Sequence, residues 1–479
     1  MKNLSPLPPI TSTPHHLHTP SPLHLHIPLA PLLLCTTIGF MSMINPFYHR
    51  GAIRNAADFH GRDTEISQII GLLRNGQSVS LIGPRRIGKS SLLIHLARPE
   101  VRQALGLDPA RSLFLLLDCQ ELGGSPPEEV YETLYFRLVE TAQQAGLALE
   151  PSSQDPGTYR ALDRLLHQIS QKEALVVVLL DEFELLAANE HLTPYFFARL
   201  RGLTTKYGLA YLTASQRPLF AITAEEEILS SPFFNIFVTL PLGLYSDDEA
   251  RSLFASRLAG NAITFNDTLI AYLLALVGPH PFFLHIAGYH AYQAADQGEM
   301  PDSRTDLAEL DSPIEVEADS HLGYLWQNLT PEEQYALAIA AGPIDTMRLL
   351  EQQCLLSQTN GRYRHTSEIL QRYVRRQEVP ELIQTGPFVI DQQRHQVWAN
   401  QDELNLTTSQ FSILVRLCAQ PGQVIRGEDL ETAVWGDVLV DDPDRLKTLI
   451  KRLRRAIAPY DNWIISERGV GYALRSPEV

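Results

Sequence analysis

The sequence has few cysteines and no excess of basic residues, and each shortage argues against a class of protein. Only 4 of its 479 residues are cysteine, and no two of them have the spacing of metal ligands or a redox pair. This argues against a structural metal site and favours a reducing cytoplasm. Acidic residues outnumber Lys and Arg by 55 to 39, so the whole molecule is not a nucleic-acid coat. A locally basic segment in this chain is therefore informative.

Internal repeats are also missing, because no period of about 20 to 50 residues is present after residue 320. A chain of 479 residues is too long to fold around a single hydrophobic core, so about three or four domains are expected. Residues 1–45 are set apart by their composition. Pro and His dominate residues 4–28, which predicts disorder. The apolar run 27–44 contains two prolines and is barely long enough to span a bilayer, so a membrane anchor is less favoured than translation that begins at Met41 or Met43.

The strongest motif spans residues 83–91, between a short apolar run and an apolar helical pattern. It matches the phosphate-binding loop G-x-x-x-x-G-K-[ST] in full. Glycines let the backbone curl so that its N–H groups point at phosphate oxygens, and the following helix adds its positive end. We expect Lys89 to reach the β and γ phosphates and the Ser90 hydroxyl to bind Mg²⁺. The predicted nucleotide-binding residues of the loop are Gly83, Pro84, Arg85, Arg86, Ile87, Gly88, Lys89, Ser90 and Ser91.

Two acids follow the most apolar run of the chain after residue 45, residues 174–180. As the end of a buried parallel strand, Asp181 and Glu182 would lie at the sheet edge where ligands bind. We expect Asp181 to hold Mg²⁺ together with Ser90, and Glu182 to orient or deprotonate the attacking water. A helix cap is the alternative for this pair. Arg217 follows the next apolar run, so the predicted catalytic set is Lys89, Asp181, Glu182 and Arg217. Ser215 as the phosphate sensor, or Arg217 as a solvated loop residue, remain alternatives.

Apolar runs at 79–82, 113–118, 174–180 and 209–213 predict a parallel sheet covered by helices. This is the expected P-loop ATPase core, residues 46–240. A helical lid is expected over 241–300, where Ser246 and Glu249 form a capping box. The acidic segment 301–320 is expected to be an exposed connector, and 321–380 a small module with helices and a hairpin at Asn360-Gly361.

Several of these elements together resemble the STAND branch of AAA+-like P-loop ATPases, over about residues 46–380. They are Gly61-Arg62-x-x-Glu65, the phosphate loop, Leu-Leu-Asp-Glu-Phe-Glu and Thr-Ala-Ser-Gln-Arg. The resemblance implies that Gly61, Arg62 and Glu65 contact adenine and ribose. It also implies that the lid turn Gly278–Pro281 contacts nucleotide through Pro281, although Gly-Pro-His-Pro departs from the family's Gly-x-Pro. By the same resemblance, 321–380 is a winged helix that closes the pocket and does not bind DNA.

The carboxyl-terminal residues 386–479 carry the locally basic segment. Short strands are expected at 388–390, 396–399 and 404–406, then a helix from Thr407 and a second helix over 430–435. The segment RLKTLIKRLRR, residues 445–455, has six Lys or Arg and no acid, with its apolar residues on one face. A hairpin with its tip at Arg468-Gly469 follows. A basic helix with an apolar back can lie in a major groove, and the hairpin arginine can reach the adjacent minor groove.

This order of elements resembles the DNA-binding domain of OmpR/PhoB-type response regulators, over about residues 386–475. The resemblance implies base contacts by Lys447 and Arg452 and a minor-groove contact by Arg468. It also implies phosphate contacts by Lys451, Arg454 and Arg455. A solvated basic helix is the alternative. The receiver domain of that family is missing here, and the ATPase takes its place.

The expected fold is therefore multidomain α/β plus α+β: a P-loop NTPase sheet, a helical lid with a small winged helix, and a carboxyl-terminal winged helix-turn-helix. The expected function is a cytoplasmic, ATP-dependent transcriptional regulator that uses ATP and Mg²⁺, hydrolyses ATP slowly, binds double-stranded DNA at the nucleoid, and assembles as a nucleotide-dependent homo-oligomer. Three alternatives stay open. They are a defence-type or signalling STAND ATPase, an origin-recognition or loader ATPase, and an inactive ATPase that serves as a scaffold.

Overall fold

The computed structural model describes residues 45–150, 155–219, 232–298, 301, 303–377, 379, 382–399, 402–436 and 444–475. The expectations for residues 1–44 lie outside these ranges. Within them, no helix has both the length and the apolar character needed to cross a membrane. Three cysteines fall in the described ranges, and all three are buried with free thiols: Cys119, Cys354 and Cys418.

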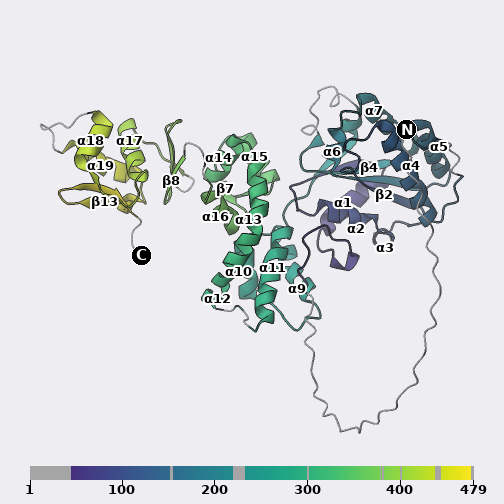
Figure 1. Ribbon diagram of the computed structural model, residues 1–479, viewed down its shortest axis with the longest axis horizontal. Coiled ribbons are helices and arrows are strands. Elements are labelled where there is room, and N and C mark those ends of the chain that lie inside the picture. Colours follow the sequence, from purple (N-terminus) through teal and green to yellow (C-terminus); the bar gives the residue numbers. More distant parts are fainter. Residues whose placement is uncertain are drawn as a thin grey trace, which may run out of the picture. The chain divides into compact units, whose positions relative to one another are not determined.

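A five-stranded parallel sheet forms the centre of the amino-terminal half, with strand order β2-β3-β4-β1-β5 (Figure 1). The strands are β1 (Ser78–Ile82), β2 (Ser112–Asp118), β3 (Leu175–Asp181), β4 (Ala210–Ser215) and β5 (Phe237–Pro241). The four apolar runs of the sequence form β1 to β4, which confirms the predicted sheet. The edge strand β5 was not predicted, because three of its five residues are exposed and its pattern is weak.

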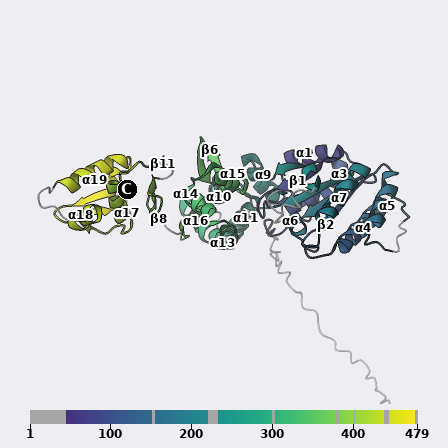
Figure 2. The same ribbon diagram turned by 90° about the horizontal axis from the view of Figure 1, so that it is seen from above.

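Helices cover both faces of this sheet, as Figure 2 shows. Leu115 and Val178 belong to a core shared with α4 (Pro127–Gln144), α5 (Tyr159–Ser170), α6 (Phe183–Ala187) and α7 (Pro194–Tyr207). Leu81 and Val177 belong to a second core, shared with α1 (Asp63–Arg74) and α2 (Lys89–Ala97). Neighbours such as Val177 and Val178 enter different cores because successive residues of a strand point to opposite faces. The short α3 (Pro99–Ala104) follows α2.

The lid and the small module after it share one core. The lid helices are α9 (Asp247–Leu258), α10 (Asp267–Val277) and α11 (Pro281–Asp296). The module has α14 (Pro331–Ile339), α15 (Ile344–Gln352), the hairpin β6 (Leu356–Thr359) and β7 (Arg362–His365), and α16 (Glu368–Arg375). Leu253, Leu284, Leu337 and Ile369 all lie in the same cluster of buried side chains. The predicted capping box of Ser246 with Glu249 and the predicted hairpin at Asn360-Gly361 are confirmed.

The prediction of an exposed connector over 301–320 is wrong. This segment forms α12 (Arg304–Glu309) and most of α13 (Asp311–Gln327), and its few apolar side chains are buried in the lid core: Leu307, Leu310, Ile314 and Ala318. The acidic composition of the segment predicted exposure to solvent, but acids of this segment form ion pairs with another helix. Asp311 and Glu315 both pair with Arg372 of α16, at 2.7 Å and 2.6 Å, so they join two helices instead of facing water alone.

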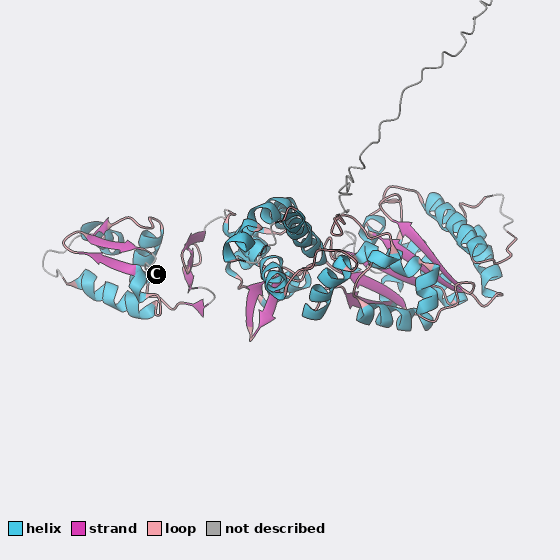
Figure 3. Cartoon of the chain, turned by 90° about the horizontal axis from the view of Figure 1, so that it is seen from below, coloured by secondary structure: helices cyan, strands magenta, loops and turns pink. Residues whose placement is uncertain are grey.

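The carboxyl-terminal residues form a separate core with their own sheets (Figure 3). The elements are β8 (Leu382–Thr385), β9 (Phe388–Asp391), β10 (Gln396–Ala399), β11 (Asp402–Glu403), α17 (Thr408–Cys418), β12 (Ile425–Arg426), α18 (Gly427–Trp435), α19 (Arg445–Ala456), β13 (Ile464–Glu467) and β14 (Gly471–Leu474). The strand predicted at 404–406 is wrong: β11 ends at Glu403, and the chain then turns into the capping box of Thr407 with Gln410. A basic helix followed by a hairpin confirms the expected winged-helix arrangement.

Candidate nucleotide cavity and DNA-binding face

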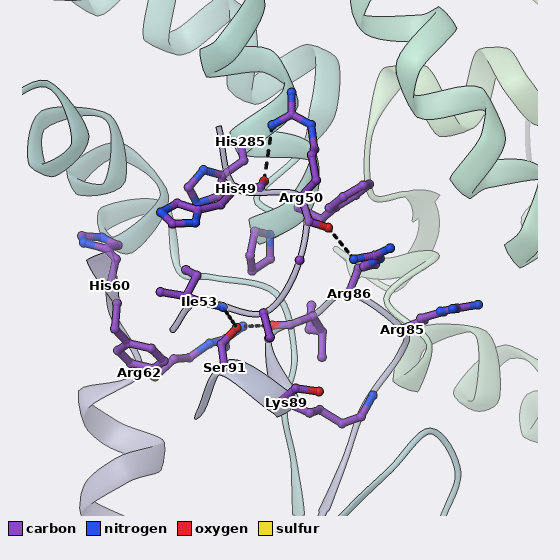
Figure 4. Close-up of a pocket in the computed structure, with 18 of the residues that line it drawn as sticks. His49, Arg50, Ile53, His60, Arg62, Arg85, Arg86, Lys89, Ser91 and His285 are labelled. Carbon is purple, nitrogen blue, oxygen red and sulfur yellow. Dashed lines mark hydrogen bonds between the residues drawn. The ribbon is translucent and has the colours of Figure 1, made fainter. Parts of the chain in front are cut away.

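A cavity of about 250 Å³ opens beside the phosphate loop (Figure 4). Of the nucleotide-binding and catalytic residues predicted from sequence, ten line it: Arg62, Arg85, Arg86, Ile87, Gly88, Lys89, Ser90, Ser91, Glu182 and Pro281. Six others are not in its lining: Gly61, Glu65, Gly83, Pro84, Asp181 and Arg217. Most of the predicted residues are thus brought together, from four separate parts of the chain.

Two glycines of the loop between β1 and α2 occupy positions where a side chain would clash or strain the backbone. A Cβ at Gly83 would lie 2.5 Å from the carbonyl oxygen of Leu242. A side chain at this position would therefore displace the chain that follows β5. Gly88 has φ 107°, a conformation that L side chains rarely adopt, and it precedes the first residue of α2. The loop therefore delivers Lys89 and Ser90 to the first turn of a helix, where backbone N–H groups have no partner in the helix.

Lys89 is buried, and its ammonium is held by oxygen atoms of the loop itself. Nζ donates to the carbonyls of Gly83 at 2.8 Å and Pro84 at 3.0 Å. Burial lowers the pKa of Lys89, and the carboxylates of Glu184, Glu182 and Asp181 oppose that shift. A buried ammonium whose partners are neutral oxygens suits a phosphate ligand, because phosphate oxygens can accept the same hydrogen bonds and also compensate the charge.

Asp181 ends β3 and stands in register with Asp118 at the end of β2. Burial raises the pKa of Asp181, while hydrogen bonds from the Ser90 hydroxyl and the Glu182 N–H oppose the shift. Ser90 and Asp181 are thus adjacent, as the prediction of a shared Mg²⁺ requires. In the described ranges, no group of three or more His, Cys, Asp or Glu could hold a metal ion. Phosphate oxygens or water would have to supply the remaining ligands.

Glu182 lines the cavity with an unusual backbone conformation. Its φ is 50° and its ψ is 42°, the left-handed region that non-glycine residues seldom occupy. Arg217, by contrast, is exposed, and Ser215 beside it is buried and donates to the Arg217 carbonyl at 2.8 Å. The catalytic role of Arg217 stays a prediction.

The Gly61-Arg62-Glu65 element lies where α1, the phosphate loop and the start of the lid meet. The guanidinium of Arg62 donates to Glu65 at 3.0 Å, to the Ile87 carbonyl at 3.2 Å and to the Gly243 carbonyl at 2.7 Å, and it lies over the ring of Tyr245. These contacts connect α1, the phosphate loop and the start of the lid. Arg62 lines the cavity, but three of its hydrogen bonds go to protein, so its geometry supports a positioning role more than the implied contact with adenine and ribose.

Gly61 and Glu65 support the same junction. A Cβ on Gly61 would lie 2.9 Å from Oε1 of Glu249, and this oxygen accepts the backbone N–H of Arg62 at 2.8 Å. Neither Gly61 nor Glu65 lines the cavity. Glu65 and Glu249 hold Arg62 in this structure, and the implied contacts of Gly61 and Glu65 with nucleotide stay a prediction.

The basic face of α19 has the exposure that DNA contact requires. Lys447, Lys451, Arg452 and Arg455 are exposed on this helix, and Arg468 is exposed at the turn between β13 and β14. Arg454 differs, because it donates to the Ile464 carbonyl and, at 3.0 Å, to the Ser466 hydroxyl. Arg454 therefore holds the helix to the hairpin, and its geometry does not support the predicted phosphate contact.

A family model described as Novel STAND NTPase 2 matches residues 65–342, more than half of the 479-residue chain. The chain belongs to this STAND NTPase family. Membership in an NTPase family implies that the chain binds a nucleotide. A second model, Transcriptional regulatory protein, C terminal, matches residues 401–474 of this STAND NTPase.

Similar proteins cover different parts of the STAND NTPase. The response regulator ArlR of Staphylococcus aureus (strain Mu50) is 30% identical over 104 residues, which are 21% of this chain and 48% of ArlR. The chain thus spans about half the length of the curated relatives it matches. A Walker-type ATPase of Pyrococcus abyssi is 16% identical with a TM-score of 0.49, covering 69% of this chain and 99% of that one. The DNA-binding domain of CpxR from E. coli is 26% identical with a TM-score of 0.19, covering 20% and 98%.

Sequence reasoning missed one acid that acts on Lys89 of the STAND NTPase without lining the cavity. Glu184 is half-buried in α6, where it accepts the N–H of Gln216 at 3.2 Å and so connects the ends of β3 and β4. Burial raises the pKa of Glu184, and Glu184 is the largest charge that raises the pKa of Lys89. The signal was present, because Asp-Glu-Phe-Glu contains a third acid, separated from Glu182 by Phe183.

Sequence reasoning also missed residues 45–60, which we call the strap. His49, Arg50, Ile53, Phe59 and His60 of the strap line the cavity. It is anchored on both sides: the Asn45 amide donates to the Tyr289 carbonyl of the lid at 2.9 Å, and the Ile53 N–H donates to Oγ of Ser91 in α2 at 3.0 Å. No sequence motif predicts that the strap lines the cavity, because its anchoring residues are common types and their partners are distant in sequence.

Proposed function

We propose that this STAND NTPase is an ATP-responsive transcriptional regulator. One observation carries the proposal: a single chain combines a phosphate loop with a buried lysine and a separate helix with four exposed cations. The first suits a nucleoside triphosphate and the second suits DNA. Their fusion favours control of DNA binding by nucleotide.

The nucleotide half of the proposal uses the cavity residues. Lys89 and the N–H groups of the loop bind the β and γ phosphates, while Ser90 and Asp181 would hold Mg²⁺. When bound, the ion supplies neutralisation of phosphate charge. Glu182, in the cavity wall next to Asp181, orients a water molecule and accepts its proton. Slow turnover to ADP and phosphate suits a switch that reports its nucleotide state.

The DNA half uses the exposed face of α19. This helix enters the major groove, where Lys447 and Arg452 reach base edges and Lys451 and Arg455 reach phosphates. Arg468 at the hairpin turn reaches the minor groove. The apolar residues of α19 are buried against the domain core, so only the basic face is available to a partner: Leu446, Leu449, Ile450 and Leu453.

Nucleotide-dependent assembly would connect the two halves. When ATP brings two or more chains together, their DNA-binding helices act at one operator with a high effective concentration. The coupling free energy is reciprocal, so DNA also favours the ATP-bound assembly. In this proposal the protein works in the cytoplasm, associated with the nucleoid when it binds DNA.

The test is DNA binding by the full chain with ATP and Mg²⁺, with ADP and Mg²⁺, and without nucleotide. Genomic footprinting first supplies the operator, and fluorescence anisotropy then gives Kd in each state, with light scattering for assembly. We expect at least about a tenfold difference between the ATP and ADP states, a coupling of about 1.4 kcal/mol. Equal Kd in all three states would contradict the coupling, and no binding at low salt would contradict the regulator itself.

A further inference from the structure

Strand β4 ends between two strands of unequal reach, β1 and β3. With β1 it pairs as far as Ser215, which lies opposite Ile82. With β3 it pairs only as far as Thr213, which lies opposite Leu180. The chain turns away from β3 at Glu182, whose backbone is left-handed, so the end of β4 extends past the backbone ladder of β3.

The side chain of Glu184 supplies an acceptor where this ladder stops. Its Oε1 accepts the N–H of Gln216 at 3.2 Å. The carbonyl of the same peptide group, that of Ser215, accepts the N–H of Gly83 at 3.2 Å. The N–H and C=O of a planar trans peptide point in opposite directions. This one peptide group therefore connects the acidic segment after β3 with the phosphate loop after β1.

The hydrogen bonds continue from this peptide to the lysine of the phosphate loop. Nζ of Lys89 donates to the Gly83 carbonyl at 2.8 Å, so Gly83 is held through both its N–H and its C=O. A continuous chain of hydrogen bonds and peptide groups thus runs from Glu184 to Lys89. Hydrogen bonds in such a chain polarise one another in the low dielectric of a protein interior.

Arg217, the predicted phosphate sensor, depends on the same peptide for its position. It follows Gln216 directly, and its carbonyl accepts the Ser215 hydroxyl at 2.8 Å. Ser215 is buried, whereas Arg217 is exposed. Gly83, Gln216 and Arg217 line one small cavity at this edge of the sheet. A side chain that fixes the peptide before Gln216 therefore also fixes where Arg217 leaves the sheet.

Glu184 acts from outside the nucleotide cavity. It is half-buried in α6 and is not in the cavity lining. Its Oε2 is buried and makes no hydrogen bond within the described ranges. Burial and the charge of Glu182 raise the pKa of Glu184, while its own N–H, the N–H of Gln216 and the charge of Lys89 oppose the shift. An effect of Glu184 on the reaction must therefore pass through Gln216 or through its charge near Lys89.

We propose that Glu184 is a positioning residue for ATP hydrolysis, and that it holds the Ser215–Gln216 peptide so that Lys89 and Arg217 are correctly placed around the γ-phosphate. This inference rests on the proposed function and adds to it a role for the third acid of Asp-Glu-Phe-Glu. Glu182 accepts a proton from water in that proposal. Glu184 accepts only a hydrogen bond from the backbone.

The experiment compares Glu184→Leu with Glu184→Gln in the full chain with Mg²⁺. Both variants remove the negative charge, but only Gln keeps an oxygen that can accept the Gln216 N–H. Calorimetry with a non-hydrolysable ATP analogue gives Kd, and phosphate release at saturating ATP gives kcat. We expect Glu184→Leu to lower kcat about tenfold, because turnover depends on the placement of the reacting groups. Its Kd should stay within about threefold of the parent, because Lys89 and the loop N–H groups remain. Glu184→Gln should recover most of kcat.

Two other glutamates provide the comparison. Glu182→Gln should lower kcat at least about a hundredfold, because an amide cannot serve as the base even though it can accept a hydrogen bond. Glu190 is exposed in the turn after α6 and does not line the cavity, so Glu190→Ala should leave both kcat and Kd unchanged. Thermal unfolding without ligand checks that each variant folds. If Glu184→Leu does not fold, Glu184→Ala takes its place in the same measurements.

The outcomes separate this inference from the proposed function. A parent chain that does not bind the analogue would contradict the ATP site itself. A parent that binds it but releases no phosphate from ATP would contradict hydrolysis, and this inference with it, and would leave nucleotide binding intact.

With an active parent, three results would overturn this inference alone. They are a parent-like kcat for Glu184→Leu, a loss of kcat in Glu184→Gln as large as in Glu184→Leu, and a loss of affinity as large as the loss of kcat. The second would show that the charge near Lys89 matters instead of the hydrogen bond, and the third would show a general structural effect. A selective loss of kcat that Gln restores is the result that supports the positioning role.

Discussion

The nucleotide cavity and the DNA-binding face use cations in opposite ways. In the cavity, Lys89 and Arg62 are buried, and loop carbonyls or carboxylates hold them. On α19, Lys451 and Arg452 are exposed to solvent. A buried charge needs partners in fixed places, because leaving it unpaired is costly. An exposed charge needs only a helix that points it outward, because water solvates it until DNA arrives.

This contrast extends to how each site is assembled. The cavity draws its wall from the strap, the phosphate loop, Glu182, Tyr245 and the start of α11. The DNA-binding cations come almost entirely from one helix of 12 residues. The cavity therefore exists only when the lid and the core are packed together. The basic face needs only its own small domain, and we expect mutations to affect the two sites independently.

The largest expected effect is that of Lys89→Ala. Loss of the ammonium removes the main cation of the phosphate loop, so ATP affinity should fall at least about a hundredfold, or about 2.7 kcal/mol. Calorimetry measures this loss. DNA affinity without nucleotide should stay within about twofold of the parent. A large change in that affinity would break the separation between the two sites.

Gly278→Ala should have the next largest effect, on stability. Gly278 has φ 66° and ψ 179°, a region open almost only to glycine, and a Cβ there would overlap the Thr366 carbonyl oxygen. We expect the free energy of unfolding to fall by about 2 kcal/mol in urea titrations, with the loss confined to the unit that forms the cavity. Gly71→Ala is the control. A Cβ on Gly71 of α1 has no atom within 4 Å, so this variant should be as stable as the parent or more so.

Lys451→Ala should weaken DNA binding about tenfold at low salt and leave nucleotide binding unchanged. Removing one phosphate contact should reduce the slope of log K against log salt by about 0.9. Anisotropy titrations at several salt concentrations measure the slope. Arg416→Ala, which removes an exposed cation of α17 in the same domain, is the control and should leave the slope unchanged. An equal change in slope for both variants would show general electrostatic attraction without a defined face.

The smallest expected effect is on the pH dependence of stability. Burial lowers the pKa of His280 from 6.5 to about 3, so below pH 6.5 the unfolded chain binds a proton that the folded chain does not. The stability from this group is complete above pH 6.5 and is lost as the pH falls toward 3. Between pH 7 and pH 6 it amounts to about 0.7 kcal/mol. His280→Phe should therefore lose about that much less than the parent over this interval in urea titrations. Parallel pH profiles for the two proteins would contradict a buried, neutral His280.

Local patterns in the sequence were enough for much of the molecule. The phosphate loop, the acid at the end of β3, the capping box of Ser246 and the basic helix were predicted because each is encoded within a few consecutive residues. Caps, turns and amphipathic helices depend on neighbours in the chain, so their signals are readable without a fold. The exposure of four α19 cations follows from the same periodicity, since the opposite face is apolar.

Tertiary structure decided the rest. Packing buries the apolar side chains of the acidic segment 301–320 in the lid core and pairs Asp311 with Arg372, and it directs Arg454 to the hairpin instead of outward. It also brought the strap and His285 to the cavity wall, from positions more than 200 residues apart. No local pattern carries such information, because the role of a buried polar group is set by partners that arrive from elsewhere in the chain. Sequence alone determined that this protein has a phosphate loop and a basic helix, and only the packing of lid on core determined what else forms the wall of the nucleotide cavity.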